Sequence, residues 1–76
     1  MEDLVRTIAL SLVDDPDSVD VRKVEKNGET VIELRVAEND MGKVIGRQGR
    51  IAKAIRTVIK AASSKDDSSI TLEITQ

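Results

Sequence analysis

The feature that most constrains this chain is that its 76 residues include no aromatic side chain and no cysteine. A chain of this length buries only about 60% of its unfolded surface on folding, so its hydrophobic core is small. Without cysteine, neither a disulfide nor a thiolate-bound zinc ion can reinforce that core. The length indicates one domain, spanning residues 1–76, whose core is built from aliphatic side chains.

The missing residue types also exclude several kinds of chemistry. Without histidine, acid–base catalysis near neutral pH lacks its usual side chain. Without aromatic rings, bases cannot stack on the protein, so nucleic-acid binding has to use aliphatic surface, backbone amides and charge. The fourteen acidic residues form no pair at an evident cleft, and the acidic segment 14–17 lacks the further oxygen ligands of a calcium loop. We therefore expect no catalytic residue, no cofactor and no metal site.

The sequence also carries no signal for a membrane or for export. No apolar run approaches the roughly 20 residues that a membrane span needs. The start, Met1-Glu2-Asp3, lacks the basic residues of a signal peptide. A cytoplasmic location is therefore expected.

The charged residues are distributed very unevenly along the chain. The formal net charge is −2, yet residues 1–40 carry five Lys/Arg against eleven Asp/Glu, whereas residues 41–64 carry six Lys/Arg and no acid. A basic patch is the electrostatic signature of phosphate binding. A solvated helix face is the alternative explanation, and the clustering of the cations around Gly46 and Gly49 favours phosphate binding.

The hydrophobic periodicities divide the chain into helices and strands. In chain order we expect a helix over 1–13, strands over 19–26 and 30–37, helices over 41–45 and 50–63, a polar turn over 64–69 and a strand over 69–75. Asn27-Gly28 predicts a tight hairpin, because both residues tolerate positive φ. Asn39-Asp40 offers an N-cap for the helix that follows. In the second strand, Ile32, Leu34 and Val36 should face the core, away from Glu33 and Arg35.

The order α-β-β-α-α-β predicts an α+β fold with a mixed three-stranded sheet. The hairpin makes the first two strands antiparallel. The crossover of about thirty residues before the last strand is long enough to link parallel strands. We expect strand 30–37 in the middle of the sheet and three helices covering one face.

The candidate site is the segment Gly46-Arg47-Gln48-Gly49 between two helices. Glycine allows positive φ and close approach of another backbone. The turn opens the helix over 50–63, whose first amides are expected to be unpaired and to favour a phosphate. Arg47 and Arg50 add positive charge. The P-loop pattern does not fit, because Ala37 stands at its first glycine position and Val44 at its hydroxyl position. The dinucleotide fingerprint does not fit either, because Val44 stands where it needs a further glycine.

Aliphatic residues beside this loop have two possible roles. They can line an apolar groove that takes unstacked bases, or they can belong to the core. For Val44, Ile45 and Ile51 both interpretations stay open. For Ile55, Val58 and Ile59 the core is favoured.

The block Val44-Ile45-Gly46-Arg47-Gln48-Gly49 resembles the signature of KH domains, whose GXXG loop clamps about four nucleotides of backbone. The element order resembles the type II form of that domain. The longer block over residues 40–58, together with Leu12-Val13-Asp14-Asp15-Pro16, is similar to the bacterial single-domain KH proteins of the KhpA family. The resemblance covers essentially the whole chain and implies a single KH domain over residues 1–76.

The resemblance implies a cytoplasmic RNA-binding protein that acts as an RNA chaperone on single-stranded RNA. It further implies a complex with a larger KH protein, KhpB, and a role in cell-wall homeostasis and cell shape. Carried over by position, residues 46–49 form the backbone clamp. Ala52 stands where the KH pattern usually has a branched aliphatic residue, which leaves the depth of the groove open. The expected RNA-binding residues are Lys43, Val44, Ile45, Gly46, Arg47, Gln48, Gly49, Arg50 and Lys53.

A second hypothesis is a protein-interaction module. In that case the helix over 50–63 is a dimer surface, and RNA binding is incidental. The two hypotheses are compatible, because one short clamp gains affinity when a second is linked to it.

Overall fold

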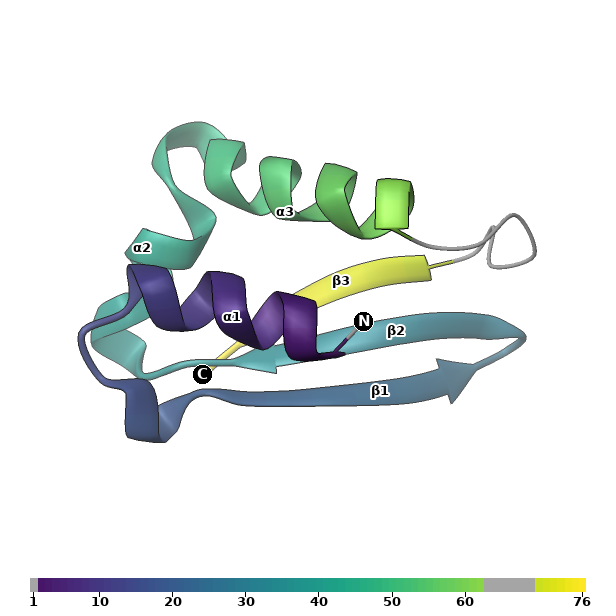
Figure 1. Ribbon diagram of the computed structural model, residues 1–76, viewed down its shortest axis with the longest axis horizontal. Helices are drawn as coiled ribbons and strands as arrows, with labels where there is room; N and C mark the ends of the chain where they lie inside the picture. The colour runs from purple at the N-terminus through teal and green to yellow at the C-terminus, as the bar shows by residue number, and fades with distance from the viewer. Residues whose placement is uncertain (1, 63–69) are drawn as a thin grey trace.

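The computed structural model describes residues 2–62 and 70–76, and their elements follow the order α-β-β-α-α-β (Figure 1). The elements are α1 (Glu2–Leu12), β1 (Asp20–Lys26), β2 (Glu29–Arg35), α2 (Met41–Ile45), α3 (Arg50–Ala62) and β3 (Ile70–Thr75). Every predicted element is confirmed in its predicted place. The second strand ends two residues early, because the chain turns into a 3₁₀ helix over Glu38–Asp40. Some predictions lie outside the described residues. These are the polar turn over 64–69 and the ends of elements at residues 1, 63 and 69.

The three strands form one mixed sheet with β2 in the middle, as expected. β1 pairs with β2 in antiparallel register, which places Val21 opposite Leu34. β3 pairs with β2 in parallel register, which places Leu72 beside Ile32. The expected type II KH arrangement of helices and strands is therefore confirmed.

The β1–β2 hairpin turns at the predicted dipeptide. Asn27 has φ 52° and Gly28 has φ 80°. Two successive positive φ values are typical of the tight turn whose twist matches that of the flanking strands. This local geometry fixes the register of the two strands and hence which side chains of β2 face the helices.

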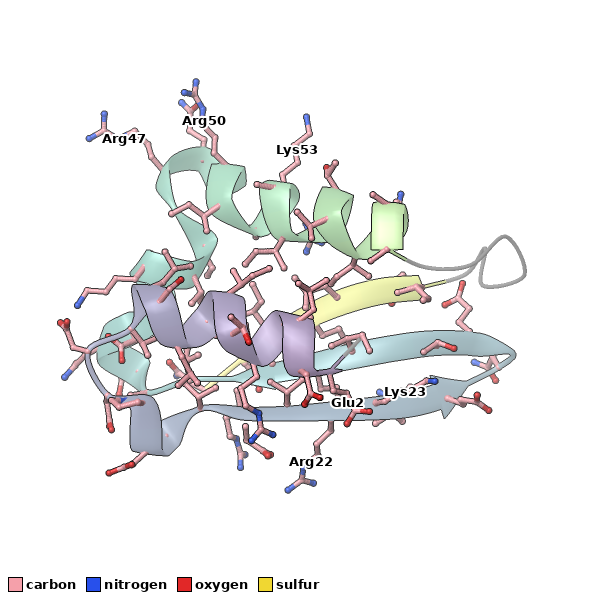
Figure 2. All side chains as sticks on the ribbon, in the orientation of Figure 1. Glu2, Arg22, Lys23, Arg47, Arg50 and Lys53 are labelled. Carbon is pink, nitrogen blue, oxygen red and sulfur yellow. The ribbon has the colours of Figure 1, made fainter. Side chains whose placement is uncertain are left out.

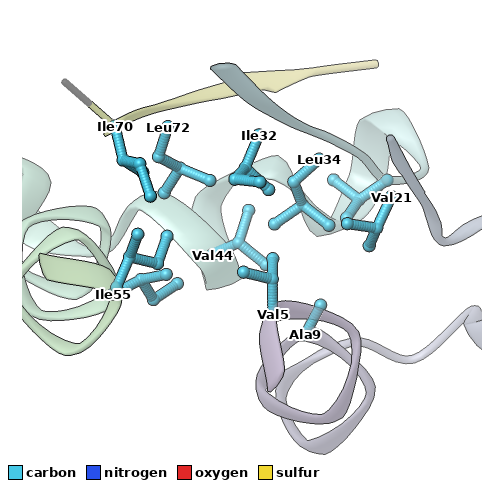
Figure 3. Close-up of a cluster of buried hydrophobic side chains, with 11 residues drawn as sticks. Val5, Ala9, Val21, Ile32, Leu34, Val44, Ile55, Ile70 and Leu72 are labelled. Carbon is cyan, nitrogen blue, oxygen red and sulfur yellow. The ribbon is translucent and has the colours of Figure 1, made fainter. Parts of the chain in front are cut away.

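The core lies between the sheet and the helices, all of which cover one face of the sheet (Figure 1). In Figure 3, Val44 of α2 lies between the strand residues above it and side chains of α1 and α3. The short helix α2 thereby joins both longer helices to the sheet. The core cluster consists of Val5, Ala9, Val21, Ile32, Leu34, Val36, Val44, Ile55, Ile59, Ile70 and Leu72.

The other face of the sheet is not covered by the described elements and carries mostly charged side chains. Arg22 and Asp20 are joined at 2.9 Å, and Lys26 and Glu33 at 3.6 Å. Because successive side chains of a strand alternate between faces, Val21 lies in the core while Val24 lies on the open face, opposite Val31. In the sequence, Val21 and Val24 are three positions apart, so β1 does not show the strict alternation of a strand with one apolar face.

The core should be sensitive to loss of volume at Leu34, which is fully buried in the central strand. Leu34→Ala should lower the free energy of unfolding by about 2–5 kcal/mol, because the cavity it leaves cannot close completely. Urea unfolding followed by circular dichroism measures this loss. The neighbouring Arg35→Ala, on the open face, should change stability by no more than about 0.5 kcal/mol. Equal losses for the two variants would contradict the assignment of the faces.

Candidate nucleic-acid interface

The predicted loop, residues 46–49, connects α2 to α3 at the side of the helical layer farthest from the sheet (Figure 1). Three of its four residues have positive φ: Gly46 at 77°, Gln48 at 58° and Gly49 at 74°. The Gly46 amide donates to the Gly42 carbonyl at 2.9 Å, which closes α2, and the Gly49 amide donates to the Gly46 carbonyl at 3.2 Å. The loop is therefore a compact turn with its own hydrogen bonds.

The two glycines are required for different reasons. A Cβ atom on Gly46 would lie 2.6 Å from Cγ1 and 2.9 Å from the backbone nitrogen of Ile51, so the start of α3 approaches this backbone too closely for any side chain. A Cβ atom on Gly49 would meet nothing within 4 Å, so only its φ value favours glycine there. Gln48 adopts the left-handed conformation despite its side chain, which costs about 1 kcal/mol. Such strain is frequent at binding sites.

Three of the predicted cations project away from the sheet together. Figure 2 shows Arg47 on the loop and Arg50 and Lys53 on α3 extending from the same side of the molecule, and all three are exposed. Arg22 extends from the opposite side, below the sheet. The basic segment of the sequence thus becomes a basic surface around the loop.

The helix α3 presents different chemistry on its two flanks. On the flank toward β3, Arg56 and Lys60 line a groove together with Ile70 and Thr71. On the flank toward α1, an apolar cleft separates the two helices. The cleft is lined by Ile8, Leu12, Arg50, Ile51, Ala54, Ile55 and Val58.

Val58 was expected in the core, and this expectation is wrong. Its side chain is 41% exposed in the α1–α3 cleft, whereas Ile55 and Ile59 are buried as predicted. In α3 the residues that face the sheet are Ala52, Ile55 and Ile59, three to four positions apart. Val58 lies about 100° around the helix from Ile59, so it faces α1 and solvent instead.

The aliphatic residues with two possible roles are now placed. Val44 is fully buried in the core cluster, so its side chain acts by holding α2. Ile45 and Ile51 are half-buried and pack against that cluster. Ile51 also lines the α1–α3 cleft, so part of its side chain is accessible.

Lys43 differs from the other predicted cations because it is engaged with two carboxylates. Its ammonium group forms a hydrogen-bonded ion pair with Asp14 and lies 3.5 Å from Oδ1 of Asp40. A contact between Lys43 and a phosphate therefore has to compete with these two acids.

Asp40 is a functional candidate that sequence reasoning missed. It was expected to cap α2, but its side chain makes no capping hydrogen bond, although it stands at the N-cap position. Instead, the amides of Asp14 and Asp15 donate to its two carboxylate oxygens, each at 3.1 Å. Among the described residues it is the only charged one that is buried, at 1% exposure. The sequence holds no signal for this pairing, because the partners lie 25 and 26 positions away.

The surroundings of Asp40 and Lys43 favour their charged forms. The hydrogen bond from the Asp14 amide lowers the pKa of the Asp40 carboxyl, although burial opposes the shift. The hydrogen bond to Asp14 raises the pKa of the Lys43 ammonium, again against desolvation. Both groups are therefore ionised at neutral pH. The buried Asp40 carboxylate accepts hydrogen bonds from the two amides and lies beside the Lys43 ammonium group.

One expected feature of the phosphate site is only partly present. The amides at the start of α3 were expected to be unpaired, but the Arg50 amide donates to the Arg47 carbonyl and the Gly49 amide to Gly46. A tight 3₁₀ turn, Arg47–Gly49, precedes α3 and uses these donors itself. The amides of Arg47 and Gln48 come before this pairing in the chain.

Two further kinds of feature are absent from the described residues. Within ranges 2–62 and 70–76, no three acidic, histidine or cysteine side chains gather as metal ligands would. None of the described helices has the length and apolar character needed to cross a membrane.

Comparison with known proteins yields one family. The family model described as the KH domain of KhpA/KhpB matches residues 2–74. The chain is 58% identical to the RNA-binding protein KhpA of Clostridium acetobutylicum and 54% identical to that of Caldanaerobacter subterraneus, in each case over 97% of this chain and 99% of the relative. It is 49% identical to the RNA-binding protein KhpA of Listeria monocytogenes over 97% of both chains. No solved structure matches.

The close approach of Gly46 to Ile51 can be tested with matched alanine substitutions. Gly46→Ala should lower the free energy of unfolding by more than about 2 kcal/mol, because it adds both a left-handed strain and a clash with Ile51. Gly42→Ala is the control, since Gly42 is helical and has open space; it should stabilise the fold by up to about 1 kcal/mol. Urea unfolding compares the two. Equal stabilities would show that the turn does not need the contact.

Proposed function

Since this chain belongs to the KhpA/KhpB family of KH domains, we propose that it grips the backbone of single-stranded RNA through the loop of residues 46–49, with little sequence specificity. The family is one of RNA-binding proteins, not of enzymes. The observation that carries the proposal is the exposed turn with three positive φ values, surrounded by Arg47, Arg50 and Lys53.

The turn suits a sugar–phosphate chain for steric and electrostatic reasons. Gly49 leaves open space within 4 Å of the position a Cβ would occupy, so a backbone can approach it closely. A phosphate at this point can accept from the amides of Arg47 and Gln48 and from the arginine side chains. None of these contacts reads a base, so the grip is independent of sequence.

The bases of a bound strand need a surface other than aromatic rings. The groove between α3 and β3 is lined by the cations Arg56 and Lys60, by Thr71 and the carboxylate of Glu29, and at its base by the buried Ile59, Ile70 and Leu72. This groove lies on the flank of α3 that also carries the exposed side chain of Lys53. We assign this groove to the bases and sugars that follow the clamped phosphates. The full set of RNA-binding residues that we propose is Lys43, Val44, Ile45, Gly46, Arg47, Gln48, Gly49, Arg50 and Lys53, with Val44 acting from the core.

The physiological setting that we propose follows the family resemblance. The chain is a single KH domain over residues 1–76 that acts in the cytoplasm as an RNA chaperone. It works with a KhpB-like KH protein, and the pair contributes to cell-wall homeostasis and cell shape. One clamp of about four nucleotides binds weakly, in the micromolar range typical of phosphate-dominated binding, so pairing with a second KH domain gives useful affinity.

The clamp can be tested by reversing its charge. Replacing both Arg47 and Gln48 by aspartate should abolish binding to a short single-stranded RNA, because two carboxylates would face the phosphate. Both side chains are exposed, so circular dichroism and the unfolding midpoint should stay unchanged. Gel shift or fluorescence anisotropy at low salt measures binding.

The control for this experiment reverses one charge on the open face of the sheet. Arg22→Asp makes the same arginine-to-aspartate change far from the loop, as Figure 2 shows, and should retain most of the affinity. RNA binding by the double aspartate variant as tight as by Arg22→Asp would contradict the assignment of the loop.

A second function, association with another protein chain, is favoured by the α1–α3 cleft. Its lining is almost wholly apolar, and it includes Val58, an aliphatic residue that is 41% exposed. Exposed apolar surface of this kind marks interaction sites. The cleft and the β3-side groove lie on different flanks of α3, so a homodimer or a complex with a KhpB-like protein leaves the RNA groove open.

Association through the cleft predicts concentration-dependent sedimentation. The parent chain should shift from monomer to dimer as concentration rises, and Val58→Glu should remain monomeric, because a charge would be buried in the interface. Thr57→Glu, one position away on the same helix and outside the cleft lining, is the matched control and should dimerise like the parent. A parent chain that stays monomeric at every concentration yet binds RNA tightly would argue against this function.

A further inference from the structure

We propose that Asp40 is a positioning residue of the RNA clamp: by holding the chain between α1 and β1 against the start of α2, it fixes the direction in which α2 delivers the loop of residues 46–49. The inference rests on the proposed RNA-binding function, and it assigns a role to a residue that does not itself touch RNA.

The helix α2 cannot hold its own position. It has five residues, Met41–Ile45, whereas isolated helices shorter than about 12 residues are marginal even with favourable sequences. Its orientation therefore depends on tertiary contacts at its beginning, middle and end. Since Gly46 follows directly, any tilt of α2 moves the clamp.

The middle and the end of α2 are held by packing. Val44 is fully buried among the core side chains. Gly46 lies so close to Ile51 that no Cβ fits between them. These two contacts hold the middle of the helix and its exit, and Met41 and Ile45 add packing against the same core at its two ends. Hydrogen bonds at the N-terminal end can then set its direction.

Asp40 supplies the contact at that end. Its two carboxylate oxygens accept the amides of Asp14 and Asp15 at 3.1 Å each, and its side chain is 2% exposed. A carboxylate that accepts hydrogen bonds from two adjacent amides is fixed in orientation as well as in position, because each of its oxygens accepts one of them. Hydrogen bonds to a charged acceptor are also stronger than neutral ones.

An electrostatic role of Asp40 and a positioning role predict opposite effects on RNA binding when Asp40 is replaced. Asp40 and Asp14 are both negative, both pair with Lys43 and both carry charge that repels phosphate. Replacing either with asparagine removes one negative charge, so simple electrostatics predicts equal or tighter RNA binding for both variants. Positioning predicts weaker binding for Asp40→Asn only, because Asp14 is 83% exposed and its side chain holds no amide of the linker.

The first experiment compares Asp40→Asn with Asp14→Asn in the full chain, using fluorescence anisotropy with a short labelled oligouridylate. Asparagine keeps one acceptor but cannot accept both amides. We expect Asp40→Asn to bind about tenfold more weakly than the parent, a change of about 1.4 kcal/mol in the free energy of binding. Asp14→Asn should bind at least as tightly as the parent. Circular dichroism at the assay temperature confirms that both variants are folded.

The second experiment uses the parent chain, so it decides the question even if Asp40→Asn does not fold. Coupling between two sites is reciprocal. If Asp40 stabilises the clamp geometry, bound RNA must stabilise the hydrogen bonds from Asp14 and Asp15. Amide hydrogen exchange at these two residues should therefore slow when the oligouridylate saturates the protein, whereas the Val24 amide, on β1, should exchange at an unchanged rate.

Each outcome has one meaning. Affinity for Asp40→Asn equal to that of Asp14→Asn, or exchange at Asp14 and Asp15 unaffected by RNA, would overturn the positioning role while leaving the RNA-binding proposal intact. Failure of the parent chain to bind the oligouridylate would overturn the proposed function, and this inference with it.

Discussion

The close approach of the Gly46 backbone to Ile51 is the contact on which the arrangement of the helices depends. A Cβ atom at residue 46 would lie 2.6 Å from the Ile51 side chain, so α2 and α3 can meet at this corner only through glycine. The corner lets α2 turn its single fully buried side chain, Val44, into the core while α3 lies along the sheet (Figure 3). The same corner carries the loop outward. The arrangement of the helices and the candidate site therefore both require glycine at residue 46. A substitution at this position would alter both.

A second consequence of this packing is the division of α3 into two functional flanks. The core takes the side that carries Ala52, Ile55 and Ile59, which leaves one flank beside β3 and one beside α1. The groove on the first flank has a mixed lining that includes Arg56, Lys60 and Glu29, whereas the cleft on the second is lined by aliphatic residues and Arg50. The proposed functions assign RNA to the first flank of this helix and a protein partner to the second. For a domain without aromatic residues this division is useful, because affinity for RNA has to come from charge and from pairing of domains.

The candidate site was predictable in part. Gly46 and Gly49 could be identified from their spacing between two helical patterns, because positive φ in a tight turn is a local property. Arg47, Arg50 and Lys53 could be identified because a segment without acids stays basic in any fold. Asp40 could not, since its partners are backbone amides 25 and 26 residues away and its sequence neighbours suggested an ordinary cap. Val58 was placed wrongly because periodicity gives the direction of an apolar stripe but not which part of the stripe a neighbouring helix leaves uncovered.

What the sequence determined by itself was therefore the local and periodic part of this protein. It set the order of helices and strands, the hairpin at Asn27-Gly28 and the basic loop, because each follows from residues near one another in the chain. The mixed sheet followed from that order and from the length of the crossover. Only the tertiary structure decided which cations are engaged, as Lys43 is by Asp14 and Asp40, and which apolar residues line a cleft. The physical reason is that burial and hydrogen-bond partners depend on what the fold brings from elsewhere in the chain, and that information is not present in any short stretch of residues.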